Sequence, residues 1–168
     1  IDGQLFTQAR PKARHTWAQS RLSTVIASEF EAGIGRQGGW IVLGEPELHL
    51  VGSVLVPDLA AWRLDRFPRV SGDESGIDVA PDWVCELLSP STQTKDRFLK
   101  LGRYGEAGVR WTWLVDPAAE TVEVYRGDDG AWMLAQTVMS RGPVFLPPFE
   151  SLELPLEKIW VRERSGER

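Results

Sequence analysis

The chain has 168 residues, of which 42% are hydrophobic and 26% are charged, a composition typical of one globular domain with a buried core. Its net charge of −5 excludes a global basic field that attracts nucleic acid without specificity, although a local basic groove stays compatible with it. No apolar run approaches the roughly 20 residues that span a bilayer, and the first residues lack the pattern of a signal peptide. We therefore expect a cytoplasmic protein without a membrane segment, with residues 1–168 forming a single domain.

Few residues are available for chemistry based on sulfur or imidazole. Cys85 is the single cysteine, which excludes an intrachain disulfide and a cysteine-based zinc cluster. The two histidines, His15 and His49, are too few for a multi-histidine metal site within one chain. A reaction that needs a lysine also has few candidates, namely Lys12, Lys95, Lys100 and Lys158.

The first half of the chain combines one helix with extended segments. The apolar spacing predicts a helix over 13–32 that ends at Gly33, and one face carries Leu22, Val25, Ile26, Glu29 and Phe30. Residues 40–50 and 53–62 are extended runs separated by Val51-Gly52, a pattern that predicts a hairpin. A polar loop follows within residues 64–80.

The second half alternates strands with one further helix. Residues 83–88 are apolar on both faces apart from Glu86, which is typical of a central strand covered on both sides. A helix is expected over about 93–107, closed near Gly105 or Gly108. Further strands are expected at 111–115, 121–125, 131–139 and 151–154, with a helical turn at 157–160. This order predicts a mixed α/β domain of the α+β type, with helices flanking a mixed sheet.

Two carboxylates interrupt apolar strands in the same way. Asp58 follows Val54-Leu55-Val56-Pro57, and Glu86 follows Trp83-Val84-Cys85. An ionised carboxylate in such surroundings costs roughly several kcal/mol unless a cation or hydrogen bonds compensate it. Two acids brought together suit Mg²⁺ or Mn²⁺, which prefer oxygen ligands. In the alternative interpretation both acids lie at strand ends and accept backbone hydrogen bonds, and the residue pattern alone does not decide between the two.

The predicted second helix carries three polar residues on one face. Asp96, Lys100 and Tyr104 follow one another at intervals of four residues. Because this helix directly follows the Glu86 strand, the Lys100 ammonium can reach the same site. Taken alone, however, Asp96 and Lys100 are better explained as an ordinary pair on a helix surface, worth a few tenths of a kcal/mol.

Several segments together carry a resemblance to a known family. They are Val56-Pro57-Asp58-Leu59, Pro81-Asp82-Trp83-Val84-Cys85-Glu86-Leu87-Leu88-Ser89-Pro90-Ser91-Thr92, the positions Asp96, Lys100 and Tyr104, Gly108-Val109, and Trp113-Leu114-Val115-Asp116-Pro117. In these segments the chain resembles the bacterial restriction endonuclease family called Uma-two, a branch of the PD-(D/E)XK nuclease superfamily. The similarity extends from about His15 to Tyr125, and the segment from Pro81 to Pro117 is its specific part.

The resemblance implies a restriction-endonuclease-like core in which two acids on adjacent strands hold a metal. By the pattern of the family, Asp58 and Glu86 match these metal-binding carboxylates. The superfamily usually places its lysine two residues after the second acid, where this chain has Leu88. In families like this one the lysine lies on the neighbouring helix instead, and Lys100 is the match, with Lys95 ranked second.

Further acids are weaker candidates for the site. Glu47 lies on the run that pairs with the Asp58 run, although a solvent-facing strand residue is the more ordinary interpretation. Glu29 matches the first-helix acid of the family, or it is a charge at the edge of the apolar helix face. Asp96 and Tyr104 complete the set of possible additional residues.

The resemblance implies a metal-dependent endonuclease, more narrowly a Mg²⁺-dependent endodeoxyribonuclease, that hydrolyses phosphodiester bonds. Asp58, Glu86 and Lys100 are its expected catalytic residues, Mg²⁺ or Mn²⁺ its cofactor and DNA its substrate. Nucleases with this core commonly act as dimers, so a homodimer is expected. Two alternatives stay open: a catalytically silent scaffold that binds nucleic acid or protein, and a metal-dependent hydrolase with another substrate.

Overall fold

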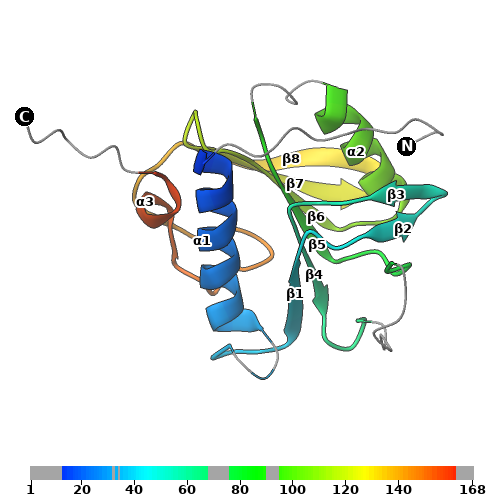
Figure 1. The fold of residues 1–168 in the computed structure, drawn as a ribbon, viewed down its shortest axis with the longest axis horizontal. Coiled ribbons are helices and arrows are strands. Elements are labelled where there is room, and N and C mark those ends of the chain that lie inside the picture. The colour runs from blue at the N-terminus through cyan, green and yellow to red at the C-terminus, as the bar shows by residue number, and fades with distance from the viewer. Residues whose placement is uncertain (1–12, 32, 34, 68–75, 90–94, 162–168) are drawn as a thin grey trace, which may run out of the picture.

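The computed structural model describes residues 13–31, 33, 35–67, 76–89 and 95–161, with the backbone alone for 95–98. The helices are α1 (Ala13–Phe30), α2 (Lys95–Glu106) and α3 (Leu156–Ile159) (Figure 1). The strands are β1 (Trp40–Gly44), β2 (Leu48–Leu50), β3 (Ser53–Leu55), β4 (Leu59–Arg63), β5 (Trp83–Leu87), β6 (Trp111–Asp116), β7 (Thr121–Asp128), β8 (Ala131–Val138), β9 (Pro143–Val144) and β10 (Leu154–Pro155). Within this described part, none of the helices has the length and apolar character needed to cross a membrane.

The core of the fold is a six-stranded mixed sheet. Its strand order is β1-β4-β5-β6-β7-β8, so β5 lies in its interior as the sequence predicts. Strands β5 and β6 run parallel, with α2 as the crossover between them, and the other neighbouring pairs are antiparallel. This arrangement confirms the predicted mixed α+β sheet flanked by helices.

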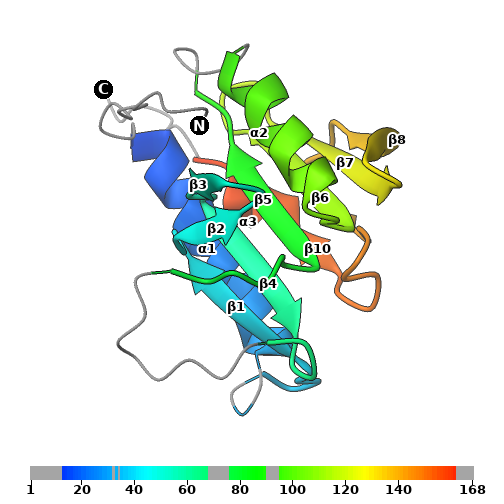
Figure 2. The same cartoon turned by 90° about the vertical axis from the view of Figure 1, so that its right-hand side faces the viewer.

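Helices cover both faces of this sheet (Figure 2). On one face, the buried residues of α1 and of the segment after β8 pack against alternate sheet residues, among them Trp83 and Cys85. On the other face, Val84 packs with Tyr104 of α2 and with the β2–β3 hairpin. Because successive side chains of a strand point to opposite faces, β5 contributes to both cores.

Phe149 joins the C-terminal segment to the first of these cores. Its ring centroid lies 5.0 Å from those of Phe30 and Trp40, 5.1 Å from that of Trp83 and 5.8 Å from that of Trp113. Tilted and edge-on contacts of this kind stabilise a core beyond the area that the rings bury. The segment after β8 is therefore anchored to α1 and to the middle of the sheet.

The two predicted extended runs are each divided in the structure. Strands β1 and β4 pair in the main sheet, whereas β2 and β3 form a separate hairpin with its turn at Val51-Gly52. The breaks coincide with prolines, Pro46 in one run and Pro57 in the other, which lack the amide hydrogen that a strand ladder requires. Between the breaks, Glu45 N donates to Asp58 O at 3.1 Å, so Asp58 lies outside the strands at the entrance to β4.

Other predicted elements are confirmed with small changes in their bounds. Gly33 adopts a φ of 82° after α1, the left-handed conformation expected of a helix stop. The β7–β8 hairpin turns at Asp129 and Gly130, both with positive φ, as a two-residue loop of type I′ requires. The expected strand at 151–154 is reduced to β10, and its partner β9 was not predicted because Pro143 was interpreted as a break.

Candidate functional site

Asp58 and Glu86 meet through the register of two antiparallel strands. Leu59 pairs with Cys85 and Ala60 with Val84, and the same register continued by one residue sets Asp58 opposite Glu86. Asp58 itself lies just outside this ladder, close enough to Glu86 for its charge to raise the pKa of that acid. The main chain ties them further, because Leu87 N donates to Asp58 Oδ2 at 2.7 Å. Each carboxylate side chain retains only 12% exposure.

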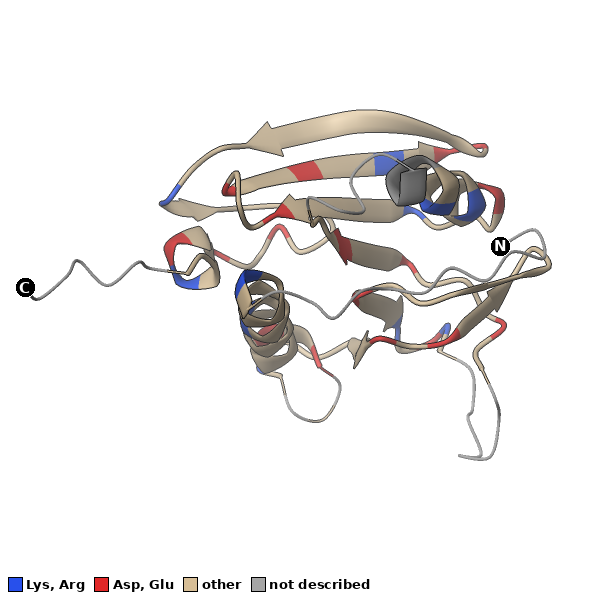
Figure 3. Cartoon of the chain, turned by 45° about the horizontal axis from the view of Figure 1, so that its top comes forward, with Lys and Arg blue, Asp and Glu red and all other residues tan. Residues whose placement is uncertain are grey.

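Helix α2 supplies a cation and a hydroxyl to Glu86. Lys100 Nζ lies 2.9 Å from Glu86 Oε2 and donates to Val56 O at 3.2 Å, while Tyr104 OH donates to Glu86 Oε1 at 2.6 Å. Lys100 and Tyr104 are one helical turn apart, so the predicted helix face does point at the strand. Figure 3 shows basic positions along α2 and acidic positions on the strands beneath it.

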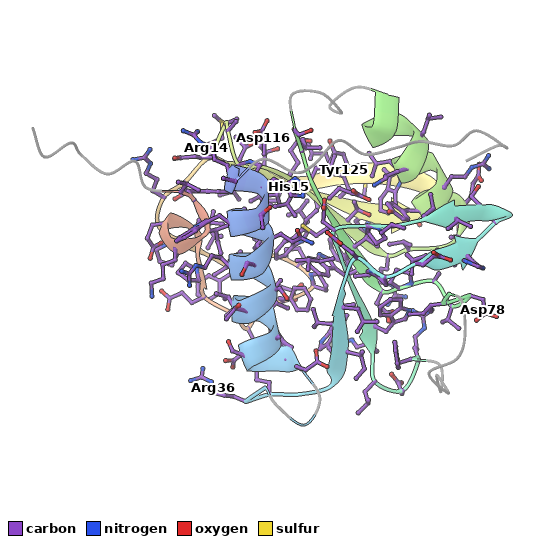
Figure 4. The ribbon with its side chains drawn as sticks, in the orientation of Figure 1. Arg14, His15, Arg36, Asp78, Asp116 and Tyr125 are labelled. Atoms are coloured by element: carbon purple, nitrogen blue, oxygen red, sulfur yellow. The ribbon has the colours of Figure 1, made fainter. Side chains whose placement is uncertain are left out.

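Helix α1 reaches the same place from the opposite face of the sheet. His15 Nε2 lies 2.8 Å from Asp58 Oδ1, and the labelled His15 lies on the side of α1 that faces the sheet (Figure 4). One turn later, Gln19 Nε2 donates to Asp58 O at 3.1 Å and to Glu45 Oε1 at 3.2 Å. These contacts were not predicted. The available signal was the helical spacing of His15 three residues before the buried Ala18.

Crowding of charge at the site shifts its ionisation. Burial raises the pKa of Glu86, the nearby charge of Asp58 adds to the rise, and Lys100 opposes it. The hydrogen bond to Asp58 raises the pKa of His15, against the effect of burial. Burial and the charge of Glu86 raise the pKa of Tyr104 well above its usual value, so Tyr104 is a neutral donor.

The donor set suits a hard divalent cation. Two carboxylates provide oxygen atoms, and each carboxylate oxygen keeps a lone pair beyond the hydrogen bond that it accepts. A cation between Asp58 and Glu86 would also relieve the repulsion that raises the pKa of Glu86. No group of three or more His, Cys, Asp or Glu side chains with metal-binding geometry occurs among the residues that the structure describes, so water or substrate would supply the other ligands.

Other predicted candidates are placed differently. Glu47 lies before β2 with half of its side chain exposed, and its Oε1 contacts His49 Nε2 at 2.7 Å instead of the Asp58 pair. The division of the extended run at Pro46 explains this placement, because Pro46 separates Glu47 from β1 of the main sheet and leaves it next to the hairpin strand β2. The backbone of Asp96 lies on α2, but its side chain falls outside the described residues, as does that of Lys95.

Glu29 takes part in a separate cluster at the other end of α1. Its two carboxylate oxygens accept hydrogen bonds of 2.8 Å from Arg36 Nε and Gln37 Nε2. The bond from Arg36 lowers the pKa of Glu29. Figure 4 shows Arg36 at the opposite end of α1 from His15, so Glu29 supports the loop after the helix and does not join the Asp58 pair.

Comparison with known families and structures identifies the family and the fold of the chain. Residues 1–157 match the family Uma2, described as "Putative restriction endonuclease". The chain is also similar to a solved "putative nuclease belonging to DUF820" from Anabaena variabilis, with 26% sequence identity, a TM-score of 0.77, and coverage of 95% of this chain and 87% of that chain. No curated protein gave a significant match. The resemblance found in the sequence is thus confirmed, and the chain belongs to the Uma2 family.

Proposed function

We propose that this protein is a metal-dependent endonuclease that hydrolyses phosphodiester bonds, with DNA as its substrate. The observation that carries the proposal is the placement of Asp58 opposite Glu86, with Lys100 Nζ 2.9 Å from the second acid. Membership of the Uma2 family and the fold shared with a protein described as a "putative nuclease" support the class of reaction. Fold alone does not determine chemistry, whereas these three side chains together provide a cation site and a positive charge.

Asp58 and Glu86 are the residues that would hold Mg²⁺ or Mn²⁺. Both carboxylates are fixed before any ligand arrives, since each oxygen already accepts a hydrogen bond from the protein. A bound cation of this kind polarises a phosphate oxygen and lowers the pKa of a coordinated water. The two carboxylates are largely buried, and they therefore attract a cation more strongly than two carboxylates at the open surface would.

Lys100 supplies the positive charge of the site. Its side chain is 14% exposed and bridges Glu86 to Val56 O, so its ammonium is held at the edge of the carboxylate pair. From there it can neutralise charge on the phosphate in the transition state or orient the attacking water. Tyr104 fixes the other oxygen of Glu86 and so keeps that carboxylate in one orientation.

A cleavage assay tests the proposal. Supercoiled plasmid and single-stranded DNA are incubated with the protein in Mg²⁺, in Mn²⁺ and in EDTA, beside the Glu86→Gln and Asp82→Asn variants. Asp82 is the matched control, because it is an equally buried acid that contacts Arg66 and not the Asp58 pair. We expect cleavage that requires the cation, disappears in Glu86→Gln and persists in Asp82→Asn.

Absence of cleavage by the wild type, or equal cleavage by Glu86→Gln, would favour a catalytically silent scaffold that binds nucleic acid or protein. One observation is compatible with that second function, since all four carboxylate oxygens are already hydrogen-bonded within the chain. Cleavage of a non-nucleic phosphodiester alone would instead indicate a hydrolase with another substrate. The expected homodimer remains a prediction, which analytical ultracentrifugation checks.

A further inference from the structure

Asp58 depends on contacts from outside the sheet for its position. It lies in the connection between β3 and β4, beyond the last pair of the β4–β5 ladder. Its side chain accepts hydrogen bonds at both oxygens, from Leu87 N at 2.7 Å and from His15 at 2.8 Å. Its main-chain oxygen accepts one from Gln19 at 3.1 Å. Two of the three groups that hold Asp58, His15 and Gln19, therefore come from α1.

Helix α1 is a rigid support for these two residues. Ala18, Leu22 and Ile26 on its buried face are 0% exposed and belong to the same core as the middle of the sheet. His15 and Gln19 are one turn apart next to this buried face, so both side chains extend to the Asp58 connection. A hydrogen-bond donor on a packed helix loses little further freedom when it holds its acceptor.

We propose that His15, assisted by Gln19, is a positioning residue that holds Asp58 in the orientation needed to bind the cation. The proposal deepens the proposed function and rests on it, because it takes Asp58 as a cation ligand. Hydrogen bonds that orient a ligating group commonly change metal affinity or activity by about 10- to 100-fold. Glu29 was the only candidate on this helix and lies at its other end, so the contacts of His15 and Gln19 give α1 a different part in the site.

The contacts of the His15 ring favour a role in positioning Asp58 over a role in proton transfer. Nε2 is engaged with Asp58 Oδ1, and Nδ1 is buried without a hydrogen-bond partner among the residues that the structure describes. A general acid or base must reach the proton that it transfers, directly or through one water. Nδ1 is buried and Nε2 is already bonded to Asp58, which is the arrangement that a fixed donor to Asp58 requires.

The test compares two substitutions of His15 with one of the other histidine. His15→Leu removes the donor at similar size, and His15→Gln keeps an N–H close to the position of Nε2. His49→Leu is the matched control, since His49 contacts the exposed Glu47. Affinity for Mn²⁺ alone is measured by titration calorimetry, and kcat and KM for plasmid cleavage are measured on the same preparations.

We expect His15→Leu to weaken Mn²⁺ binding by about 10- to 100-fold and to lower kcat, with little change in the KM for DNA. His15→Gln should restore most of the affinity, and His49→Leu should bind like the wild type. If His15→Leu does not fold, Gln19→Leu serves as the second variant, with a loss of about threefold to tenfold expected.

Three results would overturn the inference in distinguishable ways. Wild-type affinity and kcat in His15→Leu would remove the positioning role while leaving the proposed function intact. A His15→Gln protein as defective as His15→Leu would show that an imidazole, and not a hydrogen-bond donor, is required. A wild type that neither binds Mn²⁺ nor cleaves DNA would mean that the proposed function has failed, and the inference with it.

Discussion

The two ends of β5 carry two buried acids that look alike in isolation. Asp82 precedes the strand with a side chain that is 11% exposed, and Glu86 lies four residues later with 12% exposure. Each contacts a cation, Arg66 in the first case and Lys100 in the second. Burial and an ion pair are therefore common to both ends and do not distinguish a structural acid from a site acid.

The difference lies in what faces each acid. Asp82 accepts the main-chain N–H of Arg63 at 2.8 Å and pairs with Arg66, whose side chain is 46% exposed, so one negative charge meets two donors. Glu86 faces a second carboxylate, Asp58, and burial together with that charge raises its pKa despite Lys100. An excess of buried negative charge over positive charge favours a further cation. At the Glu86 end two buried carboxylates share one permanently charged partner, Lys100, whereas at the Asp82 end one carboxylate pairs with Arg66.

The largest expected effect comes from removing charge at each end. Asp58→Asn should lower metal-dependent cleavage at least about 1000-fold, equivalent to about 4 kcal/mol of transition-state stabilisation, because a cation ligand is lost. Asp82→Asn should change cleavage less than about threefold and instead destabilise the fold by about 1 kcal/mol, since it weakens the Arg66 pair. Initial rates on plasmid and urea unfolding measure the two effects, and comparable loss of cleavage in both variants would refute the distinction.

Removing the basic residue at each end should also affect cleavage differently, with a large loss at the Glu86 end and almost none at the Asp82 end. Lys100→Met should reduce cleavage about 100-fold, because a preorganised positive charge beside the phosphate is removed, while binding of Mn²⁺ persists. Arg66→Met should leave the rate almost unchanged, since its guanidinium bonds to Asp82 and to Ala80 O, at the end of β5 opposite Glu86. Single-turnover cleavage rates check this pair, and an unchanged rate in Lys100→Met contradicts it.

Added Mn²⁺ should stabilise the folded protein, and this stabilisation should depend on the acid at the Glu86 end of β5 and not on Asp82. Mn²⁺ at about 100 times its Kd should raise the free energy of unfolding by about 2.7 kcal/mol, which is roughly 5–10 °C in Tm for a chain of this size. Asp82→Asn should show the same rise, and Glu86→Gln should show almost none. Thermal unfolding followed by circular dichroism with and without Mn²⁺ decides the matter, and a rise that survives in Glu86→Gln would locate the cation elsewhere.

The smallest expected effect is a pH dependence of the free energy of unfolding in the absence of metal, which comes from His15 beside Asp58. Because the pKa of His15 is raised in the folded state, the native protein keeps that proton more tightly than the unfolded chain. The added stability is complete below about pH 6.5 and is lost as the pH rises through the folded pKa, with a slope of at most about 1.4 kcal/mol per pH unit. Urea unfolding of the wild type against His15→Gln isolates this slope, and identical slopes would show that His15 contributes none.

Local patterns predicted the parts of the site that lie close together in sequence. The continuous apolar run around Glu86 indicated a central strand, and the four-residue spacing of Lys100 and Tyr104 indicated the helix face that contacts it. Asp58 was paired with Glu86 through the family resemblance, and the β4–β5 register supplies the physical reason. These predictions succeeded because a strand and the helix that follows it constrain each other directly.

The same local patterns did not predict contacts between segments that are far apart in the sequence. His15 and Asp58 are 43 residues apart, and no periodicity within either segment indicates that α1 crosses that end of the sheet. Glu47 was a weaker candidate for the site because residues 40–50 were interpreted as one strand, whereas the break at Pro46 leaves Glu47 just before the hairpin strand β2. Register and crossing geometry are set by packing of the whole core, which one segment does not report.

The central claim is that a divalent cation binds between Asp58 and Glu86, and crystals grown with Mn²⁺ test it most directly. Anomalous scattering should give a peak in contact with both carboxylates of the wild type, and no such peak in Glu86→Gln. Asp82 should have no peak in either protein. A wild-type map without a peak at the Asp58–Glu86 pair at saturating Mn²⁺, or with one at Asp82 instead, would contradict the account.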